Sequence, residues 1–140
     1  MNQKGDLRNM RRLPPSRGCL VCGQDNPLGL QIEFFTDGKA AYGDFAPSKT
    51  YQGYDGVLHG GLLSTLLDEV MVQAIAARGV TAVTGKIEVR FRRPALIGSP
   101  LSVKGWVEEE RGSTFTAQGQ IRDEEGRILA EAKGIFFRAR

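Results

Sequence analysis

Apolar residues recur at the three- and four-residue spacing of a helix in one long stretch of the chain, from about Gly60 to Ala77. Several of them share one face and predict its buried stripe: Leu63, Leu67, Val70, Met71 and Ala74. Arg78-Gly79 follows, and a cation with a glycine is typical of a helix C-terminus. We therefore expect one long helix that packs on one side against the rest of the protein.

Most of the remaining chain alternates apolar and polar residues with the period of two that strands show. The turn Thr36-Asp37-Gly38 predicts a hairpin over Leu30 to Phe35 and Lys39 to Phe45. Longer alternating segments follow the predicted helix: Lys86–Arg92, Leu101–Val107, Phe115–Ile121 and, after a turn at 123–126, Arg127–Arg138. Strands that share one buried helix need a sheet that bends around it, and short connections favour antiparallel pairing, so the predicted class is α+β.

A glycine-rich turn leads directly into the helix, in the sequence Gly56-Val57-Leu58-His59-Gly60-Gly61. The first N–H groups of a helix lack intrahelical partners and lie at the positive end of its dipole. Because Gly60 and Gly61 have no side chains, a carbonyl oxygen could approach these N–H groups and be stabilised as it becomes an oxyanion. The turn therefore predicts an oxyanion site.

Two adjacent carboxylates, Asp68 and Glu69, interrupt the apolar helix. Asp68 lies about two helical turns beyond Gly61, so it shares a face with Gly61 and Ser64. Glu69 is turned by ~100° from Asp68, which favours a polar or interface position instead. One side of the helix thus carries both the predicted oxyanion site and a candidate base.

The pattern His59-Gly60-Gly61 with Asp68 nine positions after the histidine resembles the PaaI-like branch of the hotdog-fold acyl-CoA thioesterases. The similarity runs from about Tyr51 to Phe137, and residues 19–30 look like the leader of one subgroup. The resemblance implies a curved antiparallel sheet around one long helix and an active site formed between two subunits of a homodimer or homotetramer. The implied reaction hydrolyses an acyl-CoA thioester to the free acid and coenzyme A.

Roles for individual residues follow from this resemblance. Asp68 would act as a general base or as a nucleophile, while Gly60 and Gly61 polarise the carbonyl. Thr84 matches a threonine or serine that holds the water or thioester in related enzymes, although strand propensity would also explain it. Gln52 would help to place the thioester, or would be an ordinary polar loop residue.

Other candidate residues have two readings each. His59 could be a base, but the residue types favour a histidine that shapes the turn by hydrogen bonds. Arg90, Arg92 and Arg93 would bind the phosphates of coenzyme A, or would form a solvated outer face. Ser64 is expected to face the substrate because it lies between Gly61 and Asp68.

Length and charge narrow the possibilities further. A chain of 140 residues with a net charge of +3 suits one domain with one site and lacks the strong basic excess of a nucleic-acid binder. No apolar run reaches the length of a membrane span, and the first 18 residues lack a signal-peptide core, so we expect a cytoplasmic protein without a membrane partner. The sequence predicts a flexible basic leader over residues 1–18 and a single domain over residues 19–140.

Cys19 and Cys22 have the spacing of half a zinc site or of a redox pair. A tetrahedral structural zinc needs four ligands, and His59 is the only histidine, so a metal would require two chains to pool their cysteines. Free thiols, a disulfide and such a shared site all remain open, with free thiols favoured in a reducing cytoplasm. The expected chemistry needs neither a metal nor a cofactor.

Two other functions fit the same fold. A hydratase or dehydratase would need a suitably placed histidine and acid, whereas the glycine cradle favours acyl transfer. An acyl-CoA-binding protein without activity would keep the pocket and release no thiol. Thiol release therefore separates the three functions.

Overall fold

The structure, a computed structural model, describes residue 7 and residues 9–139. Its elements follow one another as β1 (Arg11–Arg12), β2 (Phe34–Thr36), β3 (Ala40–Phe45), the short 3-10 turn η1 (Lys49–Tyr51), α2 (Gly60–Ala76), β4 (Ala82–Phe91), β5 (Leu101–Arg111), β6 (Thr114–Arg122) and β7 (Ile128–Arg138). The predicted long helix is confirmed to within one residue of its end. Among the described residues, no helix has the length and apolar character needed to cross a membrane.

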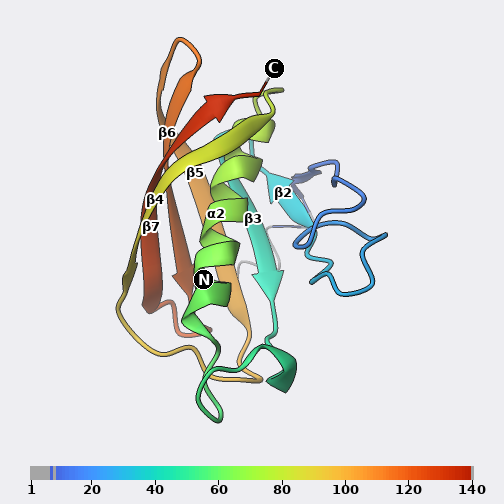
Figure 1. Cartoon of the computed structure of the whole chain (residues 1–140), viewed down its shortest axis with the longest axis vertical. Helices are drawn as coiled ribbons and strands as arrows, with labels where there is room; N and C mark the ends of the chain where they lie inside the picture. Colours follow the sequence, from blue (N-terminus) through green and yellow to red (C-terminus); the bar gives the residue numbers. More distant parts are fainter. Residues whose placement is uncertain (1–6, 8, 140) are drawn as a thin grey trace.

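All strands join one antiparallel sheet in the order β1-β2-β3-β5-β6-β7-β4. The last strand, β7, pairs with β4, the strand that follows the helix, so β4 forms one edge of the sheet and the short β1 the other. The sheet curves around α2, which lies across its concave face (Figure 1). This arrangement confirms the predicted α+β class with a sheet that bends around one helix.

The helix packs closely on the sheet because two glycines lie beneath it. Gly105 of β5 and Gly119 of β6 are paired across the two strands. A Cβ at Gly105 would lie 2.5 Å from the carbonyl oxygen of Val70, and one at Gly119 would lie 3.3 Å from the Leu67 side chain. Larger residues there would therefore push α2 away from the sheet.

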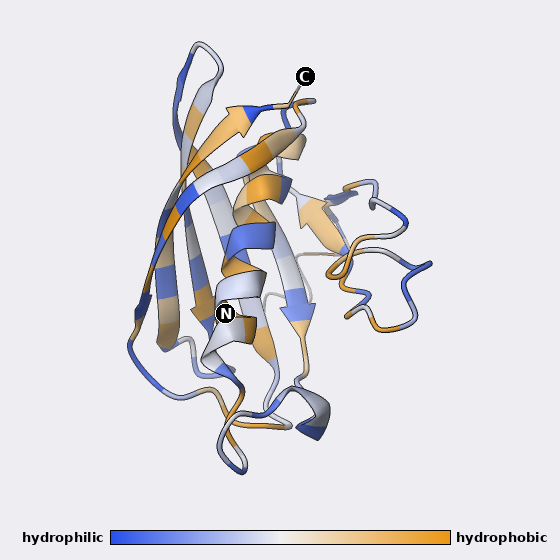
Figure 2. Ribbon diagram, viewed as in Figure 1, coloured by the Kyte–Doolittle hydropathy of each residue, from blue (hydrophilic) through white to orange (hydrophobic). Residues whose placement is uncertain are grey.

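The predicted stripe of α2 is buried, and Leu66, Gln73 and Ile75 are buried with it. The opposite side of the helix, which faces the viewer in Figure 2, is hydrophilic over part of its length. The two carboxylates of the helix, Asp68 and Glu69, are only half-buried. One face of α2 therefore belongs to the core, and the other remains accessible.

The N-terminal part of the fold differs from the prediction. The first hairpin strand is shorter than Leu30 to Phe35, because only Phe34–Thr36 pair with β3. Within the predicted flexible leader, Arg11–Arg12 pair with β2 and Leu13 is buried, so this part belongs to the folded domain. The prediction for residues 1–6 and 8 lies outside the described residues.

Candidate active site

A cavity of about 660 Å³ lies at the N-terminal end of α2, between the loop that precedes the helix and the segment that follows β4. Its lining includes His59 and Gly60 from the turn, Tyr54 from the loop, and Phe91, Arg92 and Arg93 from the end of β4. The Leu58 N–H donates to the Ala95 carbonyl and joins the two walls, while the His59 N–H donates to the Tyr51 carbonyl within the loop. The predicted oxyanion turn therefore borders a cavity large enough for a small ligand.

His59 lines the cavity, and its side chain also caps the helix. Its Nδ1 accepts a hydrogen bond from the Gly61 N–H at 2.8 Å, and its carbonyl accepts from Leu62 at 2.9 Å. The Gly61 amide is therefore occupied, which corrects the prediction that both glycine amides are unpaired. The Gly60 N–H has no acceptor among the described residues, so it is the candidate oxyanion donor.

Asp68 and Thr84 form the closest polar pair of the predicted site. The Thr84 hydroxyl donates to Asp68 Oδ1 at 2.6 Å and so links the middle of α2 to β4. The register of β4 against β7 shifts between Thr84 and Lys86, so Gly85 is the extra residue of a bulge. A Cβ at Gly85 would overlap the Phe137 ring. Glycine thus permits the bulge that lies beside Thr84.

The Gly60 amide and the Asp68 carboxylate are separated along the helix. Gly60 and Asp68 are eight residues apart, which corresponds to ~12 Å along a helix axis. Neither Asp68 nor Thr84 lines the cavity at the N-terminal end of α2. Within one chain, the Gly60 amide and the Asp68 carboxylate therefore cannot act on the same carbonyl group.

Two further predicted residues hold the local structure. The Gln52 side-chain oxygen accepts from the Gly56 N–H at 3.2 Å, and its backbone forms a bridge with Leu58. The Ser64 hydroxyl donates to the Gly60 carbonyl at 3.2 Å, so its oxygen remains available only as an acceptor. Neither side chain lines the cavity. Both side chains therefore stabilise the backbone of the turn. Within a single chain, neither is placed to contact a substrate in the cavity.

The three arginines are not equivalent. Arg92 and Arg93 line the cavity, whereas Arg90 does not. In the register of the sheet, Arg90 of β4 lies opposite Glu131 of β7. Arg92 also forms an ion pair with Glu131 at 2.9 Å. This hydrogen bond holds the pKa of Glu131 below its ordinary value. Of the two arginines that line the cavity, only Arg93 has no ion pair among the described residues, so it is the cation there that is most available to an anionic ligand.

Tyr54 and Phe91 line the cavity, but the sequence argument did not select them. Tyr54 is 89% exposed and Phe91 is 53% exposed, which is unusual for large aromatic side chains in a small domain. A tyrosine inside a glycine-rich loop and an aromatic residue at the last position of an alternating strand were the available signals. Both offer apolar surface beside the Gly60 amide.

Glu69 faces away from this site, toward the N-terminal segment. The Cys19 thiol donates to Glu69 Oε1 at 3.3 Å, and Gln73 Nε2 donates to Glu69 Oε2 at 3.0 Å. Burial raises the pKa of the Cys22 thiol to about 11, so an isolated thiol there stays protonated at neutral pH. Cys22 therefore lacks the thiolate character of a catalytic nucleophile.

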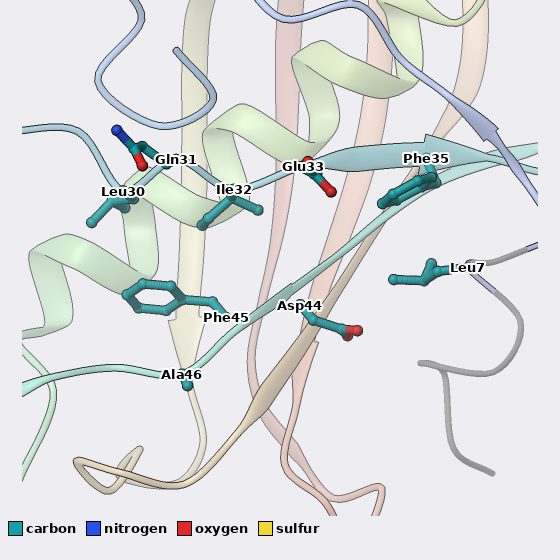
Figure 3. Close-up of a pocket in the computed structure, with 9 residues that line it drawn as sticks. All are labelled: Leu7, Leu30, Gln31, Ile32, Glu33, Phe35, Asp44, Phe45 and Ala46. Atoms are coloured by element: carbon teal, nitrogen blue, oxygen red, sulfur yellow. The ribbon is translucent and has the colours of Figure 1, made fainter. Parts of the chain in front are cut away.

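A larger cavity, of about 760 Å³, lies where β2 and β3 separate beyond the pair Phe34 and Gly43. Leu30 and Ile32 point into this space together with Phe45 (Figure 3). None of the predicted site residues lines it. We therefore place the candidate active site on the smaller cavity and on the Asp68–Thr84 pair.

Comparison with known proteins identifies the family that the chain resembles. Residues 55–130 match the family model described as the thioesterase superfamily. Acyl-coenzyme A thioesterase THEM4 of Bos taurus is 24% identical over 119 residues, which cover 83% of this chain and 49% of that protein. The chain therefore spans about half the length of this relative.

Solved structures share the fold. Protein RHA08564, described as a thioesterase superfamily protein, is 30% identical with a TM-score of 0.80, over 86% of this chain and 63% of that chain. The E. coli PaaI protein from the phenylacetic acid degradation operon is 22% identical with a TM-score of 0.73, over 79% of this chain and 81% of that chain. These likenesses confirm the predicted hotdog fold.

Proposed function

The chain belongs to the thioesterase superfamily, since the family model matches more than half of it, and we propose that it hydrolyses an acyl-CoA thioester to the free acid and coenzyme A. The name of the bovine relative, an acyl-coenzyme A thioesterase, supports this substrate class. Placement in the PaaI-like branch and in the cytoplasm remain predictions from the sequence.

The observation that carries the proposal is the Asp68–Thr84 pair. A half-buried carboxylate in a largely apolar helix is desolvated in part, so a hydrogen-bond partner is needed to offset that cost. The Thr84 hydroxyl holds Oδ1 at 2.6 Å, and Oδ2 has no donor among the described residues. A positioned carboxylate with one open oxygen is what a general base or a nucleophile requires.

The reaction would proceed by acyl transfer at the thioester carbonyl. The Gly60 N–H, at the positive end of α2, would donate to the carbonyl oxygen as negative charge develops there. Asp68 would take a proton from water as the water oxygen attacks the carbonyl carbon, or would attack that carbon itself to form a mixed anhydride that water then hydrolyses to the free acid. The carbon–sulfur bond then breaks, and the leaving thiolate of coenzyme A receives a proton.

A second copy of the chain would complete the site. Because Gly60 and Asp68 are ~12 Å apart on one helix, the Gly60 amide must meet the Asp68 carboxylate of another subunit. The accessible face of α2 and the long edge strand β4 are suited to such an interface, since a ten-residue edge strand can pair with a copy of itself. A homodimer or homotetramer is therefore the proposed assembly.

Coenzyme A would enter along the cavity at the N-terminal end of α2. Its phosphates suit the guanidinium groups of Arg92 and Arg93, whereas Arg90 of β4 lies opposite Glu131 of the neighbouring strand β7. The aromatic rings of Tyr54 and Phe91 offer apolar contact for the rest of the ligand. The acyl group would then extend toward the neighbouring subunit.

Release of free thiol tests the proposal. The purified chain is incubated with short, long and aromatic acyl-CoAs, and coenzyme A thiol is followed with a chromogenic thiol reagent. Turnover with at least one acyl-CoA that is lost in Asp68→Asn supports a thioesterase. Tight binding of acyl-CoAs without thiol release would support a binding protein, and addition of water to an enoyl-CoA without thiol release would support a hydratase.

A further inference from the structure

A cluster of two thiols and a carboxylate lies on the side of α2 away from Asp68. The Sγ atoms of Cys19 and Cys22 and a carboxylate oxygen of Glu69 all lie within 4.8 Å of one another. Cys22 is buried, whereas Cys19 and Glu69 are half-buried. The three groups come from two distant parts of the sequence, the N-terminal segment and the middle of the helix.

We propose that Cys19, Cys22 and Glu69 bind one zinc ion per chain. With cysteine and histidine as the only ligands considered, the sequence predicted that a zinc site would need the cysteines of two chains. The fold supplies a third ligand from within the same chain. This site is independent of the proposed thioesterase activity, because none of its ligands contacts Asp68 or Thr84 in the hydrogen bonds of the described residues.

The distances fit a small tetrahedral ion. With zinc at ~2.3 Å from sulfur and ~2.1 Å from oxygen, tetrahedral ligand atoms are separated by about 3.6 to 3.8 Å. Cys19 Sγ and Glu69 Oε1 are 3.3 Å apart, and every pair in the cluster falls within 4.8 Å. Side-chain adjustments of about 1 Å or less would bring all three groups to an ion at their centre.

The loop that carries the cysteines is built tightly. The Gly23 N–H donates to the Cys19 carbonyl at 3.0 Å, and the Val21 N–H donates to Cys19 Sγ at 3.3 Å. A Cβ at Gly23 would overlap the backbone of Arg17 and Cys19, so the residue after Cys22 must be glycine. An N–H group directed at sulfur stabilises a thiolate, and a closed turn fixes both sulfurs in advance.

Charge and second contacts also favour a cation. No lysine, arginine or histidine among the described residues forms an ion pair with Glu69. Gln73 Nε2 donates to Glu69 Oε2 at 3.0 Å and lies 3.7 Å from Cys22 Sγ, so it orients two of the ligands. A divalent cation would neutralise most of the charge on two thiolates and one carboxylate.

Binding would require no oxidant. The two thiols would each release a proton to solvent as their sulfurs bind Zn²⁺, and Glu69 would bind through one oxygen. The half-buried position of Cys19 leaves the fourth ligand position to water. The ion would tie residues 19–22 to α2 and so stabilise the N-terminal segment on the domain. A Cys19–Cys22 disulfide, the competing arrangement, would leave Glu69 without a cation.

Metal titration of the full chain tests the site. The protein is purified under reducing conditions, freed of metal with a chelator and titrated with Co²⁺. We expect thiolate-to-cobalt charge-transfer absorption that saturates at one ion per chain and disappears when Zn²⁺ displaces the cobalt. Saturation at one ion per two chains would overturn the role of Glu69, and absence of the absorption with both thiols reduced would overturn the site.

Variants separate the ligands from their neighbours. Glu69→Gln keeps the shape of the side chain and should weaken zinc affinity about tenfold or more, as loss of an ordered ligand does. Asp68→Asn, one residue away on the same helix, should bind zinc within about twofold of wild type, since Asp68 is not a ligand. Unchanged affinity in Glu69→Gln would overturn the three-ligand site.

Thermal unfolding gives a second readout that does not depend on a spectroscopic signal. Zinc should raise the Tm of the wild type, because an ion that binds only the folded state stabilises it. Cys19→Ser, which changes a half-buried side chain, should lose this rise even if Cys22→Ser fails to fold. An equal zinc-dependent rise in Cys19→Ser and wild type would contradict the proposal.

Discussion

Asp68 and Glu69 are neighbours on α2, but they belong to two different regions of the molecule. Asp68 faces the edge strand β4, where the Thr84 hydroxyl is its donor at 2.6 Å. Glu69 faces the N-terminal segment, where it contacts the Cys19 thiol and Gln73. A rotation of ~100° about the helix axis separates these surroundings.

From this difference in surroundings we infer a different role for each carboxylate. The β4 side of α2 is open for a second chain and carries only one fixed donor, which suits a group that must react. The N-terminal side surrounds its carboxylate with sulfur and amide groups of the same chain, which suits a group that holds a cation. Each of the following predictions tests one side against the other.

Asp68→Asn should have the largest effect, because it keeps the shape of the side chain and removes the base or nucleophile. We expect kcat to fall by ~10²-fold or more with little change in KM, as loss of a general base typically does. Steady-state kinetics with the best acyl-CoA measures this, and circular dichroism checks the fold. A larger loss in Glu69→Gln than in Asp68→Asn would reverse the assignment.

Thr84→Val should lower kcat about tenfold, because it removes one hydrogen bond to a charged oxygen while keeping a β-branched side chain. Thr84→Ser keeps the hydroxyl and is the matched control, with activity expected close to wild type. If Val and Ser at this position behave alike, the hydroxyl does not position Asp68.

Glu69→Gln should keep thioesterase activity within about tenfold of wild type, since an accessible polar substitution away from the reacting groups has a small effect. The same protein should lose zinc affinity. Parallel measurements of kcat and of zinc binding on one preparation therefore separate the two carboxylates directly.

The double variant Cys19→Ser with Cys22→Ser should have the smallest effect on activity, because the proposed reaction uses no thiolate. Its Tm in the presence of zinc should fall below that of the wild type. Removal of zinc from the wild type with a chelator should leave turnover in place. Turnover that is abolished by the chelator and restored by zinc would contradict this separation of roles.

The sequence predicted the parts of the fold that depend on periodicity. The helix, the long strands and the α+β class were correct because their apolar patterns extend over many residues. The strand at residues 30–35 was too long in the prediction, since β2 and β3 separate at Phe34. The pairing of Arg11–Arg12 with β2 carries no apolar signal and could not be predicted.

For the candidate site, motifs located the residues but not their contacts. The occupied Gly61 amide depends on the tautomer and rotation of His59, which no pattern encodes. The contact between Cys19 and Glu69 joins residues 50 positions apart, so only the fold could supply the third candidate ligand. Tyr54 and Phe91 likewise became candidates only when the cavity placed them beside Gly60.

Complementation between two inactive variants tests the central claim, a site shared by two chains, most directly. Asp68→Asn keeps the Gly60 amide, and Gly60→Val keeps Asp68 but covers the amide with a side chain. Heterodimers of the two, isolated through different affinity tags, would contain one native site and one doubly altered site.

The account predicts that these heterodimers recover about half of the wild-type activity, since one of the two symmetric sites is intact. Each variant alone should remain inactive under the same conditions. Heterodimers as inactive as their parents, with exchange of subunits verified by mass, would contradict a site that combines Gly60 of one chain with Asp68 of the other.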